Sequence, residues 1–373
     1  MMDGTLIIGK HLISVFAAIA VVLVVGSGTP LPGIAPEFIA GRALGDVDRL
    51  PERFSILALG LTPILNGVAI GEICRLLFQW CPPPENEARW TAAWTAILTR
   101  LMVLAVAALQ GFGVAEALEA AGALKVGVVA PKLVIVLTVV ASTAALLWLS
   151  ECIKVSGLRH GVWQLWSASF FLSLPANLAG SVEATRVGAM PEVNWLLSTA
   201  YIVLSAGAVV AVNLFWVRSL HASGRSRERE NSDVLSIFVW PIFLSSYVGG
   251  YVLMLLLLLA GGHWQPSGIV LKAAASLTIA VLIPIFVFAY ARLHSKTLQA
   301  APSGRSAIYS AAAIIAAMEI VLFLLGSFLV EIADLPLSVN GVLLIVVVTV
   351  FLALANDREV TELTDRMRAA DRA

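Results

Sequence analysis

The sequence predicts an all-α polytopic membrane protein with about ten transmembrane helices. Of its 373 residues, 59% are hydrophobic and only 13% are charged. Charged residues make up about 25% of a typical soluble domain. Apolar stretches also recur at the length of roughly 20 residues that a helix needs to cross a hydrocarbon core about 30 Å thick. Short polar breaks separate them, so no sizeable soluble domain is expected.

The apolar stretches define the expected elements in chain order. The first lacks a basic n-region and a cleavage site, so we expect a retained helix rather than a removed signal peptide. The longest connection, residues 26–53, follows it and carries mixed charges. Such a length among short loops indicates a segment with its own role, one that could fold into the membrane cavity. The expected spans are residues 6–25, 54–78, 90–113, 134–152, 162–178, 195–217, 235–259, 269–291, 308–330 and 339–354.

The distribution of Lys and Arg predicts the orientation, because the net charge of zero says nothing about partners. Positive residues are enriched in cytoplasmic loops of membrane proteins. Here they concentrate in alternate loops, with Arg218, Arg225, Arg227 and Arg229 between the sixth and seventh spans. This pattern places both termini in the cytoplasm and predicts a multi-pass protein of the cell inner (plasma) membrane.

The residues give no sign of an enzyme, and we predict no catalytic residue, metal site or cofactor. The patterns H-E-x-x-H, Walker A and G-x-S-x-G are absent, and the five histidines are scattered singly. Cys74, Cys81 and Cys152 lie in or beside apolar segments without metal-type pairing, which favours buried small side chains over a disulfide framework. No two acidic residues share a mid-helix face, as a proton relay would need.

Several short strings give a more specific indication. VGSGTPLPGI at 25–34 must turn abruptly, because its prolines lack a donor and its glycines allow unusual φ values. With SILALGLTPILNGV at 55–68 it resembles the first two helices of SecY, the channel subunit of the general protein-secretion translocon. Further strings follow in the family's order: Thr99-Arg100 with QGFG at 110–113, WLSECIKVSGLRHG at 148–161, WPIFLSSY at 240–247 and NGVLLIVVV at 340–348.

The resemblance to SecY implies a clamshell of two inverted five-helix halves, residues 1–178 and 179–356, followed by a short cytoplasmic tail, residues 357–373. It places a plug-like loop at 26–53 and a lateral gate between helices two, three, seven and eight. Asn66, Gln110 and Ser246 are the polar residues expected at the gate, where hydrogen bonds would hold it closed. The expected apolar ring at the pore waist is Leu61, Leu65, Val162, Trp166, Phe243 and Ile345. The alternative is that these side chains face lipid or serve ordinary helix packing.

The chain also departs from the family's pattern. Arg159 and His160 replace a family glycine and asparagine, while Glu151 is retained and is expected to pair with a base or an amide donor. Charges between Asp46 and Glu52 suit a plug in a dry waist poorly. The cytoplasmic loops that dock a ribosome or a motor ATPase in the family are short here. The expected cytoplasmic docking residues are Arg159, Arg225, Arg227, Arg229 and Arg305.

These features favour a SecY-like protein-conducting channel or membrane-insertion subunit for a specialised set of clients. A hydrophobic constriction would block ions, while its side chains part around a passing polypeptide. The alternatives are a non-conducting scaffold for membrane-protein assembly and a small-molecule permease or flippase. The resemblance implies client polypeptides and a small SecE-like clamp subunit as partners. The short loops argue against a motor ATPase or a ribosome, and nothing indicates nucleic acid.

Overall fold

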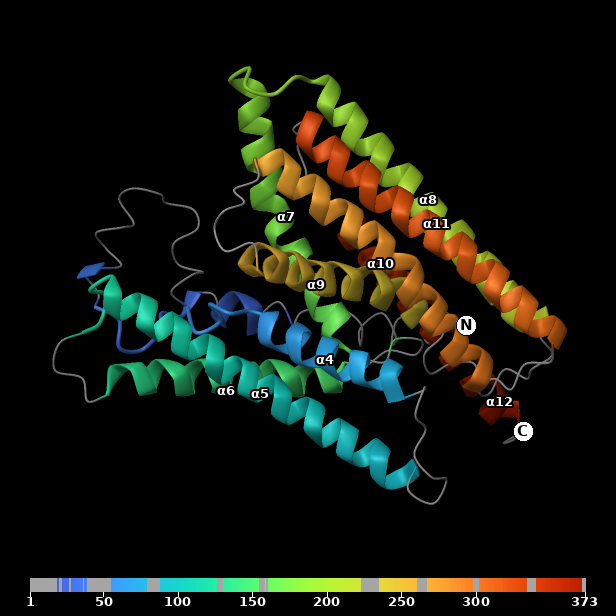
Figure 1. Cartoon of the computed structure of the whole chain (residues 1–373), viewed down its shortest axis with the longest axis horizontal. Helices are drawn as coiled ribbons and strands as arrows, with labels where there is room; N and C mark the ends of the chain where they lie inside the picture. Colours follow the sequence, from blue (N-terminus) through green and yellow to red (C-terminus); the bar gives the residue numbers. More distant parts are fainter. Residues whose placement is uncertain are drawn as a thin grey trace. The chain divides into compact units, whose positions relative to one another are not determined.

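The computed structural model is nearly all helical in the residues that it describes, which are 19, 22–26, 28–35, 37–38, 55–78, 88–125, 130–153, 158, 160–222, 235–259, 267–297, 302–333 and 340–370. Figure 1 shows the order of the helices in this part of the chain. They are α4 (Thr62–Phe78), α5 (Ala88–Ala120), α6 (Pro131–Cys152), α7 (Val162–Arg186), α8 (Val193–Ala222), α9 (Ser236–Leu259), α10 (Gly268–Thr297), α11 (Pro302–Ala333) and α12 (Gly341–Ala370). The predicted all-α class is confirmed.

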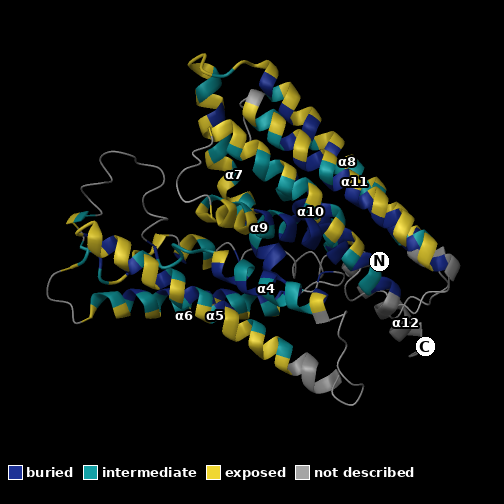
Figure 2. Ribbon diagram, viewed as in Figure 1, coloured by how far each residue is buried: buried dark blue, intermediate teal, exposed yellow. Residues whose placement is uncertain are grey.

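Six helices in the described part are long and apolar enough to cross a membrane: α5, α6, α8, α9, α10 and α11. α4 has only 17 residues, and α12 is apolar only over Gly341–Ala355. Most of the first expected span, residues 6–25, lies outside the described residues. Exposed apolar side chains lie on helix faces as lipid contact requires, for example Leu196, Val203 and Leu204 on α8, whose exposed positions are yellow in Figure 2.

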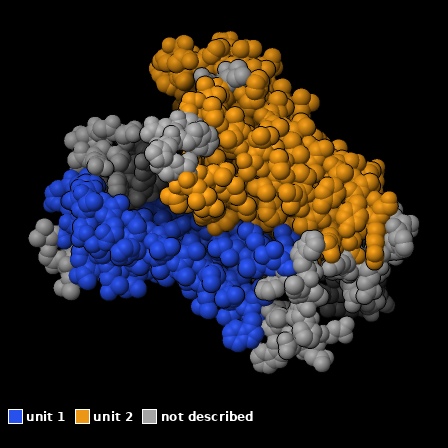
Figure 3. Space-filling model, in the orientation of Figure 1, with its two compact units in different colours: residues 1–154, 160–169 blue, residues 155–159, 170–373 orange. Residues whose placement is uncertain are grey.

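The chain divides into two compact units, shown in Figure 3. Unit 1 comprises residues 1–154 and 160–169, and unit 2 comprises residues 155–159 and 170–373. The division falls inside α7, between Ser169 and Phe170. The halves expected from the resemblance, with their boundary at 178, remain a prediction.

The turn predicted at residues 25–34 is held in unit 1 by backbone pairing at two places. Pro30 forms an isolated bridge with Ser55, and Ile34 forms one with Leu124. Leu31 and Ile34 are buried in a hydrophobic cluster with residues of α5 and α6. The rest of the plug-like loop, including its charged stretch from Asp46 to Glu52, lies outside the described residues.

The same pairing corrects the start of the second expected span. Residues 56–61 form turns, and the Ile56 N–H donates to the Thr29 carbonyl at 2.9 Å, so the start of this stretch pairs with the 25–34 segment. α4 therefore begins at Thr62 and not at residue 54, and Leu61 precedes the helix. At the other end of the chain, α12 continues to Ala370, through the stretch expected to be a short tail.

Two helices end in the same glycine motif, which fixes where they stop. After α5, the N–H of Ala123 bonds to the Leu118 carbonyl at 2.9 Å, and Gly122 has φ 66°. After α7, the N–H of Ala189 bonds to the Ala184 carbonyl at 2.9 Å, and Gly188 has φ 74°. Glycine is favoured at this left-handed position, and the paired bonds satisfy carbonyls that the helix end leaves free.

Each unit has its own packing. In unit 1, α5 packs against both α4 and α6. In unit 2, α11 packs against α8, α10 and α12, and α9 packs against α10 and α12. In the C-terminal half of α11, the Tyr201 hydroxyl of α8 donates to the Leu322 carbonyl at 3.0 Å, and Gly341 of α12 approaches the same carbonyl. This contact sets the register of three helices in unit 2.

Candidate functional site

The unit 1 positions of the expected pore ring lie around the start of α4 and the start of α7. Leu61 and Val162 are buried, with exposed fractions of 8% and 1%, and Leu65 and Trp166 are half-buried. Trp166 lies on α7 with its ring centroid 5.8 Å from that of Trp163. A tryptophan pair at this position is bulkier than an aliphatic side chain of the pore ring would be.

The unit 2 positions of the expected ring differ from each other in their surroundings. Ile345 on α12 is completely buried. Phe243 is half-buried on α9 within a row of aromatic rings, with centroids 6.0 Å from Trp240 and 6.4 Å from Tyr247. The ring as a whole would join the two units, so its assembly remains a prediction.

The expected gate residues do not form one cluster within unit 1. Gly67 of α4 lies opposite Val103 of α5, and Gly71 lies opposite Thr99, so the two helices are antiparallel. In this register Asn66 and Gln110 are offset by about 9 Å along the helix axes. Gln110 Oε1 is buried and accepts no hydrogen bond from the described residues. Ser246 of unit 2 donates to the Ile242 carbonyl of its own helix at 3.0 Å.

A G-x-x-x-G pattern brings α4 and α5 into close contact. A Cβ atom added to Gly67 would lie 2.7 Å from Val103 Cα and 2.8 Å from its backbone nitrogen. One added to Gly71 would lie 2.7 Å from Thr99 Oγ1. Small residues four apart allow two membrane helices to approach backbone to backbone. This contact packs α4 closely against α5 and so fixes the positions of the residues on either side of it.

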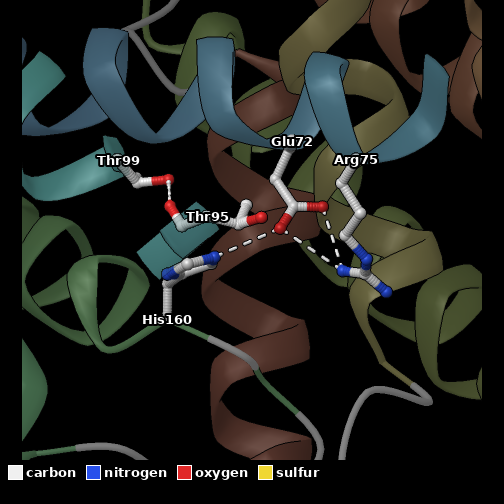
Figure 4. Close-up of polar contacts among 5 residues, drawn as sticks. All are labelled: Glu72, Arg75, Thr95, Thr99 and His160. Carbon is white, nitrogen blue, oxygen red and sulfur yellow. Dashed lines mark hydrogen bonds and ion pairs between the residues drawn. The ribbon is translucent and has the colours of Figure 1, made fainter. Parts of the chain in front are cut away.

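A buried carboxylate, absent from our sequence expectations, lies one residue beyond this contact. The Glu72 side chain is only 3% exposed. Its Oε2 lies 3.0 Å from Arg75 Nη1, and its Oε1 lies 3.2 Å from His160 Nε2 (Figure 4). Arg75 is one turn further along α4, whereas His160 directly precedes the Gly161–Val162 start of α7. We call Glu72, Arg75 and His160 the Glu72 cluster; it ties the end of α4 to the start of α7.

A second ion pair connects α5 to α6 and agrees with the expectation that Glu151 pairs with a base. Arg100 Nε and Nη2 donate to the two carboxylate oxygens of Glu151 at 2.8 and 3.0 Å. This bidentate geometry is the strong form of the arginine–carboxylate pair. Both partners belong to strings that resemble SecY. The pair therefore has a structural role in unit 1.

We expect charge reversal of this pair to show a measurable coupling. Arg100→Glu should lower the free energy of unfolding by about 1 kcal/mol, because the side chains are 54% and 32% exposed and water screens the pair. The double variant Arg100→Glu with Glu151→Arg should recover most of the loss. Denaturant unfolding of the purified single and double variants checks this. Equal stability of the Arg100→Glu single variant and the double variant would contradict the assignment.

The expected cytoplasmic docking residues are only partly described. Arg305 is exposed in the first turn of α11. Arg159, Arg225, Arg227 and Arg229 lie outside the described residues. Docking through these arginines remains a prediction.

These features define a polytopic helical membrane protein of two compact units, with apolar and aromatic residues at the expected waist positions and ion-paired helices in unit 1. A family model described as SecY matches residues 55–355. The chain belongs to the SecY family.

Curated relatives agree with this assignment over part of their length. The protein translocase subunit SecY of Thermus thermophilus is 30% identical over 207 residues, which are 50% of this chain and 47% of the relative. SecY of Escherichia coli K12 is 26% identical over 223 residues, 56% of this chain and 48% of the relative. The matches thus span about half the length of the curated relatives.

Solved structures show the same fold over nearly the whole chain. One is entitled "The structure of a protein conducting channel". The match covers 92% of this chain and 91% of that chain, with a TM-score of 0.53 and 12% identity. Another concerns the plug domain of SecY. The match covers 94% of this chain and 92% of that chain, with a TM-score of 0.54 and 11% identity. At such identity the likeness establishes the fold alone.

Proposed function

We propose that the chain is a protein-conducting channel or membrane-insertion subunit that serves a specialised set of client polypeptides. The match to the SecY family over residues 55–355 is the observation that carries this proposal. The fold of a protein-conducting channel over 92% of the chain supports it. Apolar or aromatic side chains stand at all six expected waist positions, as a constriction that excludes ions requires.

The architecture of unit 1 suits a frame that must stay intact while polypeptides pass. The close contact of α4 with α5, the Arg100–Glu151 pair and the Glu72 cluster each connect two different segments of this unit. Leu65, the half-buried waist position on α4, lies two residues before Gly67 and six residues before Gly71. Its backbone is therefore held on α5 by the glycine contact, while its side chain is only half-buried.

Location and partners follow the same proposal. The protein would lie in the inner membrane with both termini in the cytoplasm. Lys and Arg concentrate in alternate loops, and the loop with Arg218, Arg225, Arg227 and Arg229 is an example. A small SecE-like subunit would clamp the two halves. The short loops favour clients that reach the channel without a ribosome or a motor ATPase docked on it.

Site-specific photocrosslinking tests the channel function. A photoreactive residue at Leu65 or Phe243 should form adducts with a stalled nascent membrane protein, because both positions belong to the expected waist. The matched control is the same residue at Leu109 on α5 or Leu204 on α8, which are 74% and 72% exposed. We expect several-fold fewer client adducts at these control positions. Absence of client adducts at both waist positions, under conditions where an established SecY channel forms them, would refute the proposal.

A further inference from the structure

Glu319 is a completely buried acidic residue in the middle of an apolar helix of unit 2. It lies in the part of α11, Gly304–Glu331, that is long and apolar enough to span a membrane. Its exposed fraction is 0%, and neither carboxylate oxygen has a hydrogen-bond partner among the described residues. An ionised carboxylate in such surroundings costs many kcal/mol unless a positive charge compensates it. The compensating group therefore has to be found on the elements that pack against α11.

α8 and α12 offer no positive charge at the level of Glu319. The contact of Tyr201 and Gly341 with Leu322 sets their register against α11. Tyr201 is the nearest titratable group on α8, and its hydroxyl donates to the Leu322 carbonyl. The next such groups on α8, Arg218 and His221, are more than three turns beyond that level, at the far end of the helix. The apolar part of α12, residues 341–355, contains no titratable side chain.

α10 and α11 itself offer none either. Lys272 of α10 pairs with Glu331 of α11 at 2.8 Å, which places Glu319 level with Pro284. No titratable residue lies on α10 between Lys272 and Tyr290, and Arg292 and His294 lie further along it. On α11, Tyr309 and Arg305 are about 15 Å and about 21 Å from Glu319 along the axis. No described cation therefore lies level with the carboxyl group.

We propose that Glu319 is a proton-binding site in the interior of unit 2, where its carboxyl group is neutral and exchanges one proton with water. Three buried polar atoms on the facing helices also have no partner among the described residues: Ser198 Oγ, Asn213 Nδ2 and Thr349 Oγ1. Such atoms are suitable sites for bound water molecules.

The proton holds α11 in its packed position against α8 and α12. Loss of the proton leaves a negative charge between Ile315 and Leu322, both of which are buried. That charge favours water entry or movement of α11, so packing weakens when the proton is lost. This inference concerns unit 2 alone and does not depend on whether the chain conducts polypeptides.

Infrared spectroscopy of the full-length protein in lipid nanodiscs tests the protonation directly. A neutral carboxylic acid and a carboxylate absorb at different positions. At pH 7 the wild-type spectrum should contain a protonated-acid band that is missing in Glu319→Gln. The matched control on the same helix is Glu331→Gln, which removes an exposed, ion-paired carboxylate and should leave the band unchanged. A wild-type spectrum without that band would overturn the proposal.

Discussion

Gly67→Ala is expected to lower the free energy of unfolding by about 2 kcal/mol, as overpacking of a close interface does. The added methyl would meet the backbone of Val103, with its Cα at 2.7 Å and its nitrogen at 2.8 Å. Backbone atoms cannot rotate out of the way, so α4 and α5 have to separate. Unfolding of the purified variant by SDS or by heat measures the loss.

Gly113→Ala is the matched control on α5. Nothing lies within 4 Å of a Cβ atom at this position. Alanine is a better helix former than glycine, so this change should be neutral or should stabilise by up to about 1 kcal/mol. Opposite signs at the two glycines would show that packing, and not helix propensity, decides the effect. A neutral Gly67→Ala variant would mean that α4 and α5 are not in backbone contact.

Glu72→Ala is expected to cost about 3 kcal/mol, which is the effect of breaking a buried ion pair by removing one partner. The change leaves Arg75 and His160 without their shared acceptor, at side-chain exposures of only 18% and 23%. Glu72→Gln keeps one acceptor oxygen and should lose less. Denaturant unfolding of both variants, compared with wild type at the same pH, shows whether Glu72→Ala loses more stability than Glu72→Gln.

Glu183→Ala serves as the control for this prediction. Glu183 also pairs with an arginine three residues later, but its side chain and that of Arg186 are 55% and 76% exposed. Exposed pairs contribute little, so the expected loss is less than about 0.5 kcal/mol. If the two alanine variants lost equal stability, the burial of Glu72 would not determine its contribution.

The fold was predictable wherever one apolar stretch forms one helix. Residues 235–259, for example, differ from α9 by a single residue at the start. The predicted start of the second span was wrong, because backbone pairing with a distant segment replaces the helix there. Ser55 pairs with Pro30, and the Ile56 N–H donates to the Thr29 carbonyl. It was incomplete for α12, because charged residues end an apolar pattern without ending a helix.

The site was predictable to a smaller extent, because pairs of residues far apart in sequence depend on tertiary structure. Arg100 and Glu151 each stood in a recognised string, yet only the structure shows that they bind each other. Glu72 and Glu319 were missed, although each is a single acidic residue in an apolar run. That isolation from other acidic residues was the available signal, since an acidic side chain in a membrane helix has to be paired, as Glu72 is with Arg75, or neutralised.

The length of α12 determines how far Ala370 lies from the apolar part of the same helix. Its helix runs on for 15 residues after Ala355, which corresponds to about 22 Å along its axis. A continuous helix acts as a stiff spacer, whereas a flexible tail of equal length would let its end fold back. A fluorophore attached near Ala370 would therefore report distances from a point at a fixed separation from the apolar part of α12.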